Sequence, residues 1–195
     1  LNVVLRAASK LKQQNLTHIK FLIVGDGAHL ETLTSLAKEQ GLDNVVFTGL
    51  RPKNRIPDFL AASDACLVHK RKGELFETHM PFRIFETLAM ARPIILGVRG
   101  LAAAFLRASG GGICIEPEDE DELLAAIERL RSDPGWANEA GLKGREYVLK
   151  HFNYDTLAQQ YLDVTQKTVA EHSQPRPARV REPRRAPVAE ERPSP

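Results

Sequence analysis

The chain has 195 residues, of which 43% are hydrophobic, and this is enough for one sizeable folded domain. Its formal net charge of +2 is close to neutral, which argues against a dedicated nucleic-acid-binding protein. No apolar run approaches the roughly 20 residues that a membrane-spanning helix needs, and Cys66 and Cys114 lie singly in apolar runs, as small core residues of a reducing compartment do.

Helical patterns alternate with apolar runs of strand length from the first residue onward. After an opening helix the sequence predicts a strand at 18–24, a helix at 28–40, a strand at 45–47, a short helix around 56–60 and a strand at 65–68. A polar loop at 69–78, a central helix from Pro81, a strand at 94–96, a helix at 101–108 and a strand at 113–115 follow. Such alternation predicts an α/β fold, a Rossmann-like open parallel sheet with helices on both faces.

Helices and a proline-rich tail complete the predicted chain. One helix is expected to begin at Asp119 or Asp121, and two more are expected at 134–150 and 154–169, with Asn153 as an N-cap. Residues 171–195 hold six prolines, six arginines and almost no large apolar residue, so this tail is expected to be disordered. Because four glutamates interrupt its arginines, a solvated tail is favoured over a lipid- or nucleic-acid-binding one. A domain at 1–170 and a tail at 171–195 are therefore predicted.

The stretch HMPFRIFETLAMARP, residues 79–93, is the strongest candidate for a ligand site. Pro81 suits the first turn of a helix, so the N–H groups of Phe82, Arg83 and Ile84 are expected to lack helical partners and to face an anion. Arg83 adds a positive charge. One turn later the Glu86 carboxylate can accept hydrogen bonds from a pair of hydroxyl groups.

Other motifs are weaker or missing. The turn Gly25-Asp26-Gly27 follows a strand and precedes a helix, as nucleotide-binding turns do, but Leu30 occupies the position where the dinucleotide fingerprint needs a third glycine or alanine. The basic run at 69–72 either folds over a diphosphate or is an ordinary exposed loop. His79 is read as a polar loop residue because no partner carboxylate is visible. No phosphate-binding P-loop, serine nucleophile elbow or paired-histidine metal motif is present, and no metal or cofactor is expected.

Several segments together resemble the C-terminal half of family 4 glycosyltransferases, which have the two-domain GT-B architecture. The matching segments are LIVGDG, LDNVVFTG, PFRIFETLAMARPII, GGICIEP and HFNY, in that order and spacing. The resemblance covers residues 1–167. It implies that this domain binds a nucleotide-diphosphate sugar, with a UDP-sugar expected first, and that transfer retains the anomeric configuration.

The resemblance also implies roles for individual residues. Glu86 matches the glutamate that binds the ribose hydroxyls, and the amides near Phe82 and Arg83 match the helix start that holds the diphosphate. The glycine turn matches one that lines the nucleotide cleft, through Gly25 and Gly27. The loop beside the base is matched by Leu50, Arg51 and Pro52.

Four positions depart from the family pattern: Thr78, Phe82, Arg83 and Ala91. Thr78 replaces the first glutamate of the E-x7-E pair, which contacts the sugar, and this resembles a fucosamine-transferase-like branch that acts in bacterial surface-polysaccharide assembly. The proline-serine-lysine helix start of that branch has become Pro81-Phe82-Arg83, so the cation is a planar guanidinium. Ala91 replaces a glycine, which costs about 1 kcal/mol if the backbone is left-handed there.

The family places further structure before Leu1: a central strand, a glycine-rich loop with an Arg and a Lys, and the acceptor domain. The resemblance therefore predicts an incomplete domain, with a partly exposed apolar seam between the Phe21 and Leu67 strands. It also predicts an exposed apolar stripe on the last helix, which includes Leu157 and Tyr161.

The sequence thus predicts the donor-binding part of a glycosyltransferase whose acceptor is a surface glycan or a polyprenyl-linked intermediate, bound through the missing domain. The chain alone is expected to be inactive, and a cytoplasmic location at the inner face of a membrane, with peripheral association, is compatible with this reading. Nucleic acid is not an expected partner. Two alternatives stay open: a nucleotide-sugar epimerase of the same architecture, and a non-catalytic scaffold fragment whose arginine-rich tail recruits a partner.

Overall fold

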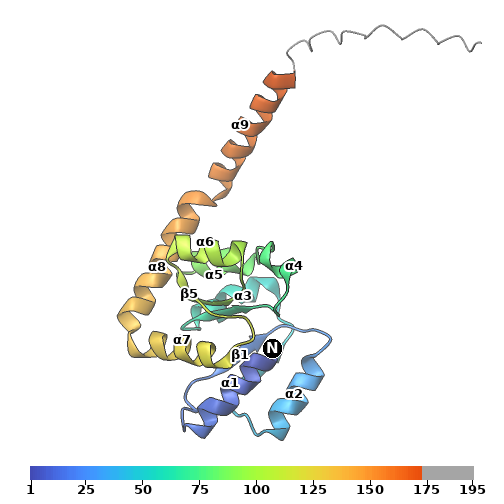
Figure 1. The fold of residues 1–195 in the computed structure, drawn as a ribbon, viewed down its shortest axis with the longest axis vertical. Helices are drawn as coiled ribbons and strands as arrows, with labels where there is room; N and C mark the ends of the chain where they lie inside the picture. Colours follow the sequence, from blue (N-terminus) through green and yellow to red (C-terminus); the bar gives the residue numbers. More distant parts are fainter. Residues whose placement is uncertain (173–195) are drawn as a thin grey trace, which may run out of the picture. The chain divides into compact units, whose positions relative to one another are not determined.

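The computed structural model describes residues 1–172, and Figure 1 shows the arrangement of the elements. Residues 1–156 form one compact unit, and the chain from Leu157 belongs to a second. The helices are α1 (Asn2–Gln13), α2 (Leu30–Glu39), α3 (Ile56–Ala61), α4 (Glu74–Glu77), α5 (Arg83–Ala89), α6 (Leu101–Ser109), α7 (Glu120–Ser132), α8 (Pro134–His151) and α9 (Tyr154–His172), with a 3₁₀ turn, η1 (Lys53–Arg55). The strands are β1 (Phe21–Val24), β2 (Val45–Gly49), β3 (Cys66–His69), β4 (Ile94–Gly97) and β5 (Gly112–Cys114).

All strand pairs are parallel, as predicted, but the described strands form two sheets. β1 pairs with β2 in one sheet, and the order β3-β4-β5 makes up the other. The interruption falls between the Phe21 and Leu67 strands, where the family resemblance places a further strand. The N–H groups of Phe21 and Gly25 bond toward β2, and those of Cys66 and Lys70 bond toward β4. Since alternate residues of a strand face opposite sides, the intervening Leu22 and Leu67 amides face the two unpaired edges.

Helices cover both faces of the sheet β3-β4-β5 (Figure 1). Ile94 and Leu96 of β4 point to one face and pack with α5, α6 and α8, while Ile95 points to the other and packs with α1 and α7. This alternation is the period of two expected of a strand that is buried on both sides. Helices α5 and α6 therefore pack on one face of the sheet β3-β4-β5. The central stretch, residues 79–93, follows β3 and includes α5, as predicted.

Helix α1 holds the two sheets together. Its Val3 and Val4 pack with Ile95 and the α7 side chains, and its Leu5 packs with α2 and β2. Salt bridges between Arg6 or Lys10 on α1 and Glu120 or Asp121 on α7 add to this contact at the surface.

The predicted element order is confirmed, but several boundaries differ; β1, for example, begins at Phe21 instead of residue 18. Two differences bear on the site. The expected polar loop at 69–78 contains the single-turn helix α4, and His69 belongs to β3. The central helix α5 begins at Arg83 instead of Pro81, because Pro81 to Ile84 first form a turn in which the Ile84 N–H donates to the Pro81 carbonyl at 3.0 Å. The predicted start at Asp119 is confirmed, since its side chain caps α7 by accepting from two amides, and the predicted cap Asn153 accepts from the Thr156 N–H.

The left-handed backbone considered for Ala91 in the sequence analysis is present in the structure. Ala91, just after α5, has φ of 54°, the left-handed conformation in which an L-residue is strained. Its N–H donates to the Leu88 carbonyl at 2.9 Å, so the strained residue closes the helix. Both cysteines are free and half-buried, and they pack against the core around β4.

Helix α9, considered by itself, carries exposed apolar side chains that include Leu157, Tyr161 and Leu162, as expected for the predicted stripe. Glu171 and His172 belong to this helix, and the remainder of the predicted tail lies outside the described residues. Of the helices in the described part of the chain, none has the length and apolar character to cross a membrane.

Candidate functional site

The predicted glycine turn, Gly25-Asp26-Gly27, follows β1 and borders open space. Gly25 has φ of 132°, and its N–H donates to the Gly49 carbonyl at 3.0 Å, which ties the end of β1 to the end of β2. The Asp26 carboxylate accepts from the Gly27 N–H at 2.7 Å. A Cβ atom added at Gly25 or Gly27 would have no neighbour within 4 Å. The turn therefore lines open space, as the nucleotide-cleft prediction requires.

The loop after β2 lies beside this turn, because Gly49, the last residue of β2, accepts the hydrogen bond from the Gly25 N–H. Leu50 is 77% exposed and Arg51 is also exposed. The predicted base-side residues and the glycine turn are thus brought together by the pairing of β1 with β2.

The segment from Thr78 to Glu86 follows β3 and belongs to the other sheet. Thr78 is exposed, and its hydroxyl donates to the Leu75 carbonyl at 3.4 Å. Pro81 is buried, and the Phe82 ring beside it is 80% exposed. Within the described residues, neither the Phe82 nor the Arg83 N–H donates to another backbone carbonyl, so both remain available to a ligand.

Ile84 corrects the prediction that three amides face a ligand. Its N–H is already bonded to Pro81, and its side chain is fully buried against β3 and β4. An apolar side chain at this position seats the helix in the core, and the accompanying turn uses the amide. Ile84 therefore supports the site without contacting a ligand.

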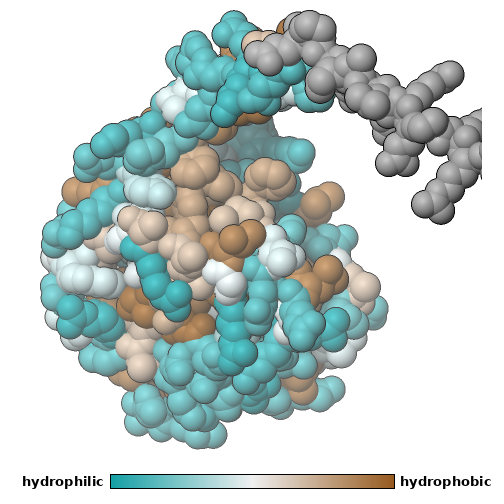
Figure 2. Space-filling model, turned by 45° about the horizontal axis from the view of Figure 1, so that its top comes forward, coloured by the Kyte–Doolittle hydropathy of each residue, from teal (hydrophilic) through white to brown (hydrophobic). Residues whose placement is uncertain are grey.

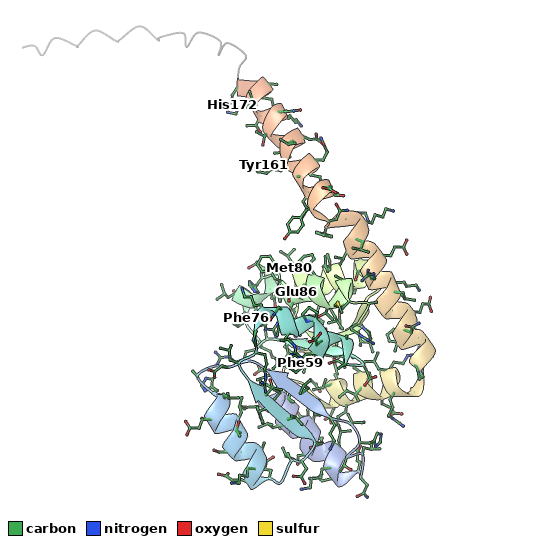
Figure 3. The ribbon with its side chains drawn as sticks, turned by 180° about the vertical axis from the view of Figure 1, so that it is seen from behind. Phe59, Phe76, Met80, Glu86, Tyr161 and His172 are labelled. Atoms are coloured by element: carbon green, nitrogen blue, oxygen red, sulfur yellow. The ribbon has the colours of Figure 1, made fainter. Side chains whose placement is uncertain are left out.

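Glu86 and Arg83 are exposed side chains on α5, and neither forms an ion pair or side-chain hydrogen bond within residues 1–172. Figure 3 labels Glu86 on this helix, together with Met80 on the segment that leads into it. By contrast, the Glu116 and Glu120 carboxylates form ion pairs. An unpaired carboxylate and an unpaired guanidinium one turn apart can accept from hydroxyl groups and bind an anion.

The predicted basic loop is held by acidic residues from the segment between β5 and α7. Lys72 donates its backbone N–H to the Glu118 carboxylate at 3.1 Å, and its ammonium lies 3.5 Å from Glu116. Arg99, after β4, forms two hydrogen bonds to the same Glu116, of 3.1 and 2.6 Å. The hydrogen bond from Arg99 holds the pKa of Glu116 below its ordinary value. The loop is therefore anchored, and the interpretation in which it swings freely over a diphosphate loses support.

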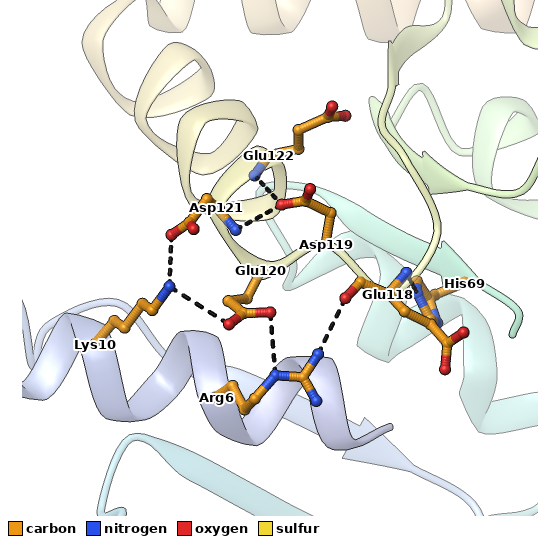
Figure 4. Close-up of polar contacts among 8 residues, drawn as sticks. All are labelled: Arg6, Lys10, His69, Glu118, Asp119, Glu120, Asp121 and Glu122. Atoms are coloured by element: carbon orange, nitrogen blue, oxygen red, sulfur yellow. Dashed lines mark hydrogen bonds and ion pairs between the residues drawn. The ribbon is translucent and has the colours of Figure 1, made fainter. Parts of the chain in front are cut away.

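His69 ends β3 and joins this acidic segment. Its Nε2 atom accepts the Glu118 N–H at 2.7 Å, and Figure 4 shows the surrounding contacts of Arg6, Lys10 and the α7 cap. Burial lowers the pKa of His69, so the imidazole is neutral and able to accept. Sequence reasoning missed this contact because 49 positions separate the two residues.

The surface of the first unit combines these polar groups with apolar side chains. Figure 2 shows apolar residues gathered on the face that it presents. In the described part of the chain, no three histidine, cysteine, aspartate or glutamate side chains converge as metal ligands would. Exposed large apolar side chains lie in the loops before helices, at Leu50 and Phe82, and in the first turns of α4 and α6, at Leu75 and Leu101.

Comparison with known proteins places these features in a family context. A family model described as "Glycosyl transferases group 1" matches residues 1–147. The GDP-mannose-dependent alpha-(1-6)-phosphatidylinositol monomannoside mannosyltransferase of Mycobacterium tuberculosis is 30% identical over 145 residues, which cover 73% of this chain and 38% of that protein. The chain spans about two fifths of the length of curated relatives that it matches.

Solved structures share the fold. Sucrose-phosphate synthase from Thermosynechococcus elongatus has a TM-score of 0.65 at 24% identity, covering 87% of this chain and 42% of that one. Anabaena Alr3699/HepE, solved in complex with UDP-glucose, has a TM-score of 0.63 at 19% identity, covering 83% and 53% of the two chains. Identities this low show the likeness of the fold alone.

Proposed function

Because this chain belongs to the group 1 glycosyl transferases, we propose that its first unit binds the nucleotide-diphosphate sugar from which a larger glycosyltransferase takes its sugar. The observation that carries the proposal is the unpaired Glu86 carboxylate, exposed on α5 one turn after two unbonded backbone amides. Glu86 accepts hydrogen bonds from the ribose hydroxyls, and Arg83 faces the diphosphate.

The same site accounts for the electrostatics of the transfer. Negative charge develops on the leaving diphosphate, and Arg83 together with the Phe82 N–H stabilises it without a metal ion in this domain. We expect transfer with retention of configuration, from the resemblance to family 4 enzymes. Turnover requires an acceptor held next to the donor, so this chain by itself binds the donor and does not transfer the sugar.

The base of the donor has two supported candidates. The family resemblance favours UDP, and the HepE structure was solved with UDP-glucose. The mycobacterial relative is named as dependent on GDP-mannose. Leu50 and Arg51 lie beside the glycine turn and contact the base, so they decide between the two nucleotides. The acceptor we propose is a bacterial surface glycan or a lipid-linked intermediate, in line with the mannosyltransferase and with a lipopolysaccharide core glycosyltransferase from Rhizobium meliloti.

The test is a calorimetric titration of the chain with UDP and with GDP, repeated on Glu86→Ala. Removing a charged hydrogen-bond acceptor is expected to weaken binding roughly tenfold, about 1.4 kcal/mol. Glu146→Ala is the matched control, because Glu146 is also exposed on a helix and has no partner within the described residues. Binding that is equal in Glu86→Ala and wild type, or absent from a folded wild-type chain, would remove the support for this assignment.

A further inference from the structure

Helix α5, which carries Glu86, is short and depends on α8 for its placement. The α8 backbone approaches it closely through two buried glycines. A Cβ atom at Gly141 would lie 2.2 Å from the Ala91 carbonyl oxygen, and one at Gly144 would lie 2.5 Å from a Leu88 methyl group. Since these distances leave no room for a side chain, the separation of α5 and α8 is set by direct contact.

Close approach fixes the separation of two helices but does not by itself fix the rotation of one about its axis. The buried side chains of Ile84, Thr87 and Leu88 fix which face of α5 packs inward. A further contact, at the C-terminal end of the helix, comes from Arg145 on α8, whose guanidinium donates a hydrogen bond to the Ala89 carbonyl. Carbonyls in the last turn of a helix lack partners within the helix, and a cation there also opposes the negative end of the helix dipole favourably.

Glu86 belongs to the same turn as this contact. Its carbonyl accepts the Met90 N–H at 3.2 Å, and Ala89 directly precedes Met90. In a seven-residue helix there is no second turn beyond Glu86 to keep the backbone aligned if the last carbonyls shift. The Ala89 contact therefore anchors the end of the turn from which the Glu86 side chain projects.

We propose that Arg145 is a positioning residue for Glu86, which it holds in the orientation that reads the ribose hydroxyls of the donor nucleotide. The inference rests on the proposed function, because it assumes that Glu86 contacts those hydroxyls. It adds a residue from a different helix, 56 positions away from the carbonyl it binds.

The experiment compares a ribonucleotide with one that lacks the hydroxyls. UDP and 2′,3′-dideoxy-UDP, or the guanosine pair if GDP binds better, are titrated into the full chain and into Arg145→Met. The preference for the ribonucleotide is expected to fall about fivefold in Arg145→Met, less than the roughly tenfold loss in Glu86→Ala, while the dideoxy affinity stays the same. Arg145→Lys, which keeps one donor and the charge, restores at least half of the preference on a logarithmic scale.

Lys143→Met serves as the control, because Lys143 lies on the same helix and pairs with Glu139 instead of α5. An unchanged preference in Arg145→Met overturns the inference, and so does an equal loss for both nucleotides, which indicates only a general structural role. The double variant with Glu86→Ala must show no further loss of preference. If wild type binds no nucleotide, the proposed function fails. Amide hydrogen exchange at Met90 then tests the anchoring of α5 by Arg145 separately: an exchange rate that is unaltered in Arg145→Met rejects that anchoring.

Discussion

Replacing Ala91 by glycine is expected to stabilise the protein. Ala91 has φ of 54°, a left-handed conformation that costs an L-residue about 1–2 kcal/mol. The close packing of the Ala91 carbonyl against Gly141 keeps the backbone in this conformation. Glycine removes this penalty but loses about 0.4–1 kcal/mol through the greater freedom of the unfolded chain. The net expectation is a gain of about 1 kcal/mol in the free energy of unfolding, or a rise of roughly 2–4 °C in Tm.

Urea unfolding followed by the fluorescence of the single tryptophan measures this gain. Trp136 is half-buried at the start of α8, and the Arg129 guanidinium lies 5.2 Å from its ring centroid. Ala104→Gly is the matched control, since Ala104 is exposed inside the helical span of α6, where the same change is expected to cost about 1 kcal/mol. If both substitutions lowered stability equally, the left-handed strain at Ala91 would be refuted.

Three further outcomes follow from the contacts described. Gly141→Ala forces a methyl group against the Ala91 carbonyl, so urea unfolding should show a loss of roughly 1–3 kcal/mol. Burial lowers the pKa of His69, opposed by Glu118 and aided by Arg6 and the Leu1 amine, so the unfolded chain binds more protons. The contribution of His69 to stability is therefore fully present above the unfolded pKa of about 6.5 and is lost as pH falls below it. When Tm is measured over a series of decreasing pH values, the fall in Tm should be smaller in His69→Gln than in wild type. Hydrogen exchange should be faster at the Leu22 and Leu67 amides, which face the unpaired edges, than at their strand neighbours; equal protection would contradict the interruption of the sheet.

Local patterns were sufficient for the order of the elements, because each strand after the first helix is a short apolar run between polar loops. They were insufficient for α4, since a four-residue helix completes only one turn and cannot display a 3.6-residue period. The start of α5 was placed two residues early for a related reason. Pro81 is compatible both with a first helical turn and with the turn that precedes one, and only the Ile84 bond to its carbonyl distinguishes them.

The candidate site divides in the same way. Glu86, Gly25 and Gly27 were predicted because their surroundings in the sequence are informative: a helix, a strand end and a motif shared with a family. The contacts that hold the site come from distant positions. Arg145 lies 56 residues from Ala89, and Arg145 follows Gly144 in a stretch with no distinctive composition. No local signal marks such a residue, so only the packed fold reveals it.

Ion pairing within the chain affects which cations are available to bind a diphosphate. A basic run next to a strand end predicts phosphate affinity from charge alone, yet Lys72 is already bound to Glu116 and Glu118. A phosphate that recruited Lys72 would have to displace these carboxylates, whereas Arg83, like Arg71 of the basic run, is exposed and has no ion pair within residues 1–172. Because an unpaired guanidinium gives up less on binding than a paired ammonium, the diphosphate is expected at Arg83 rather than at Lys72, next to the carboxylate that we propose binds the ribose.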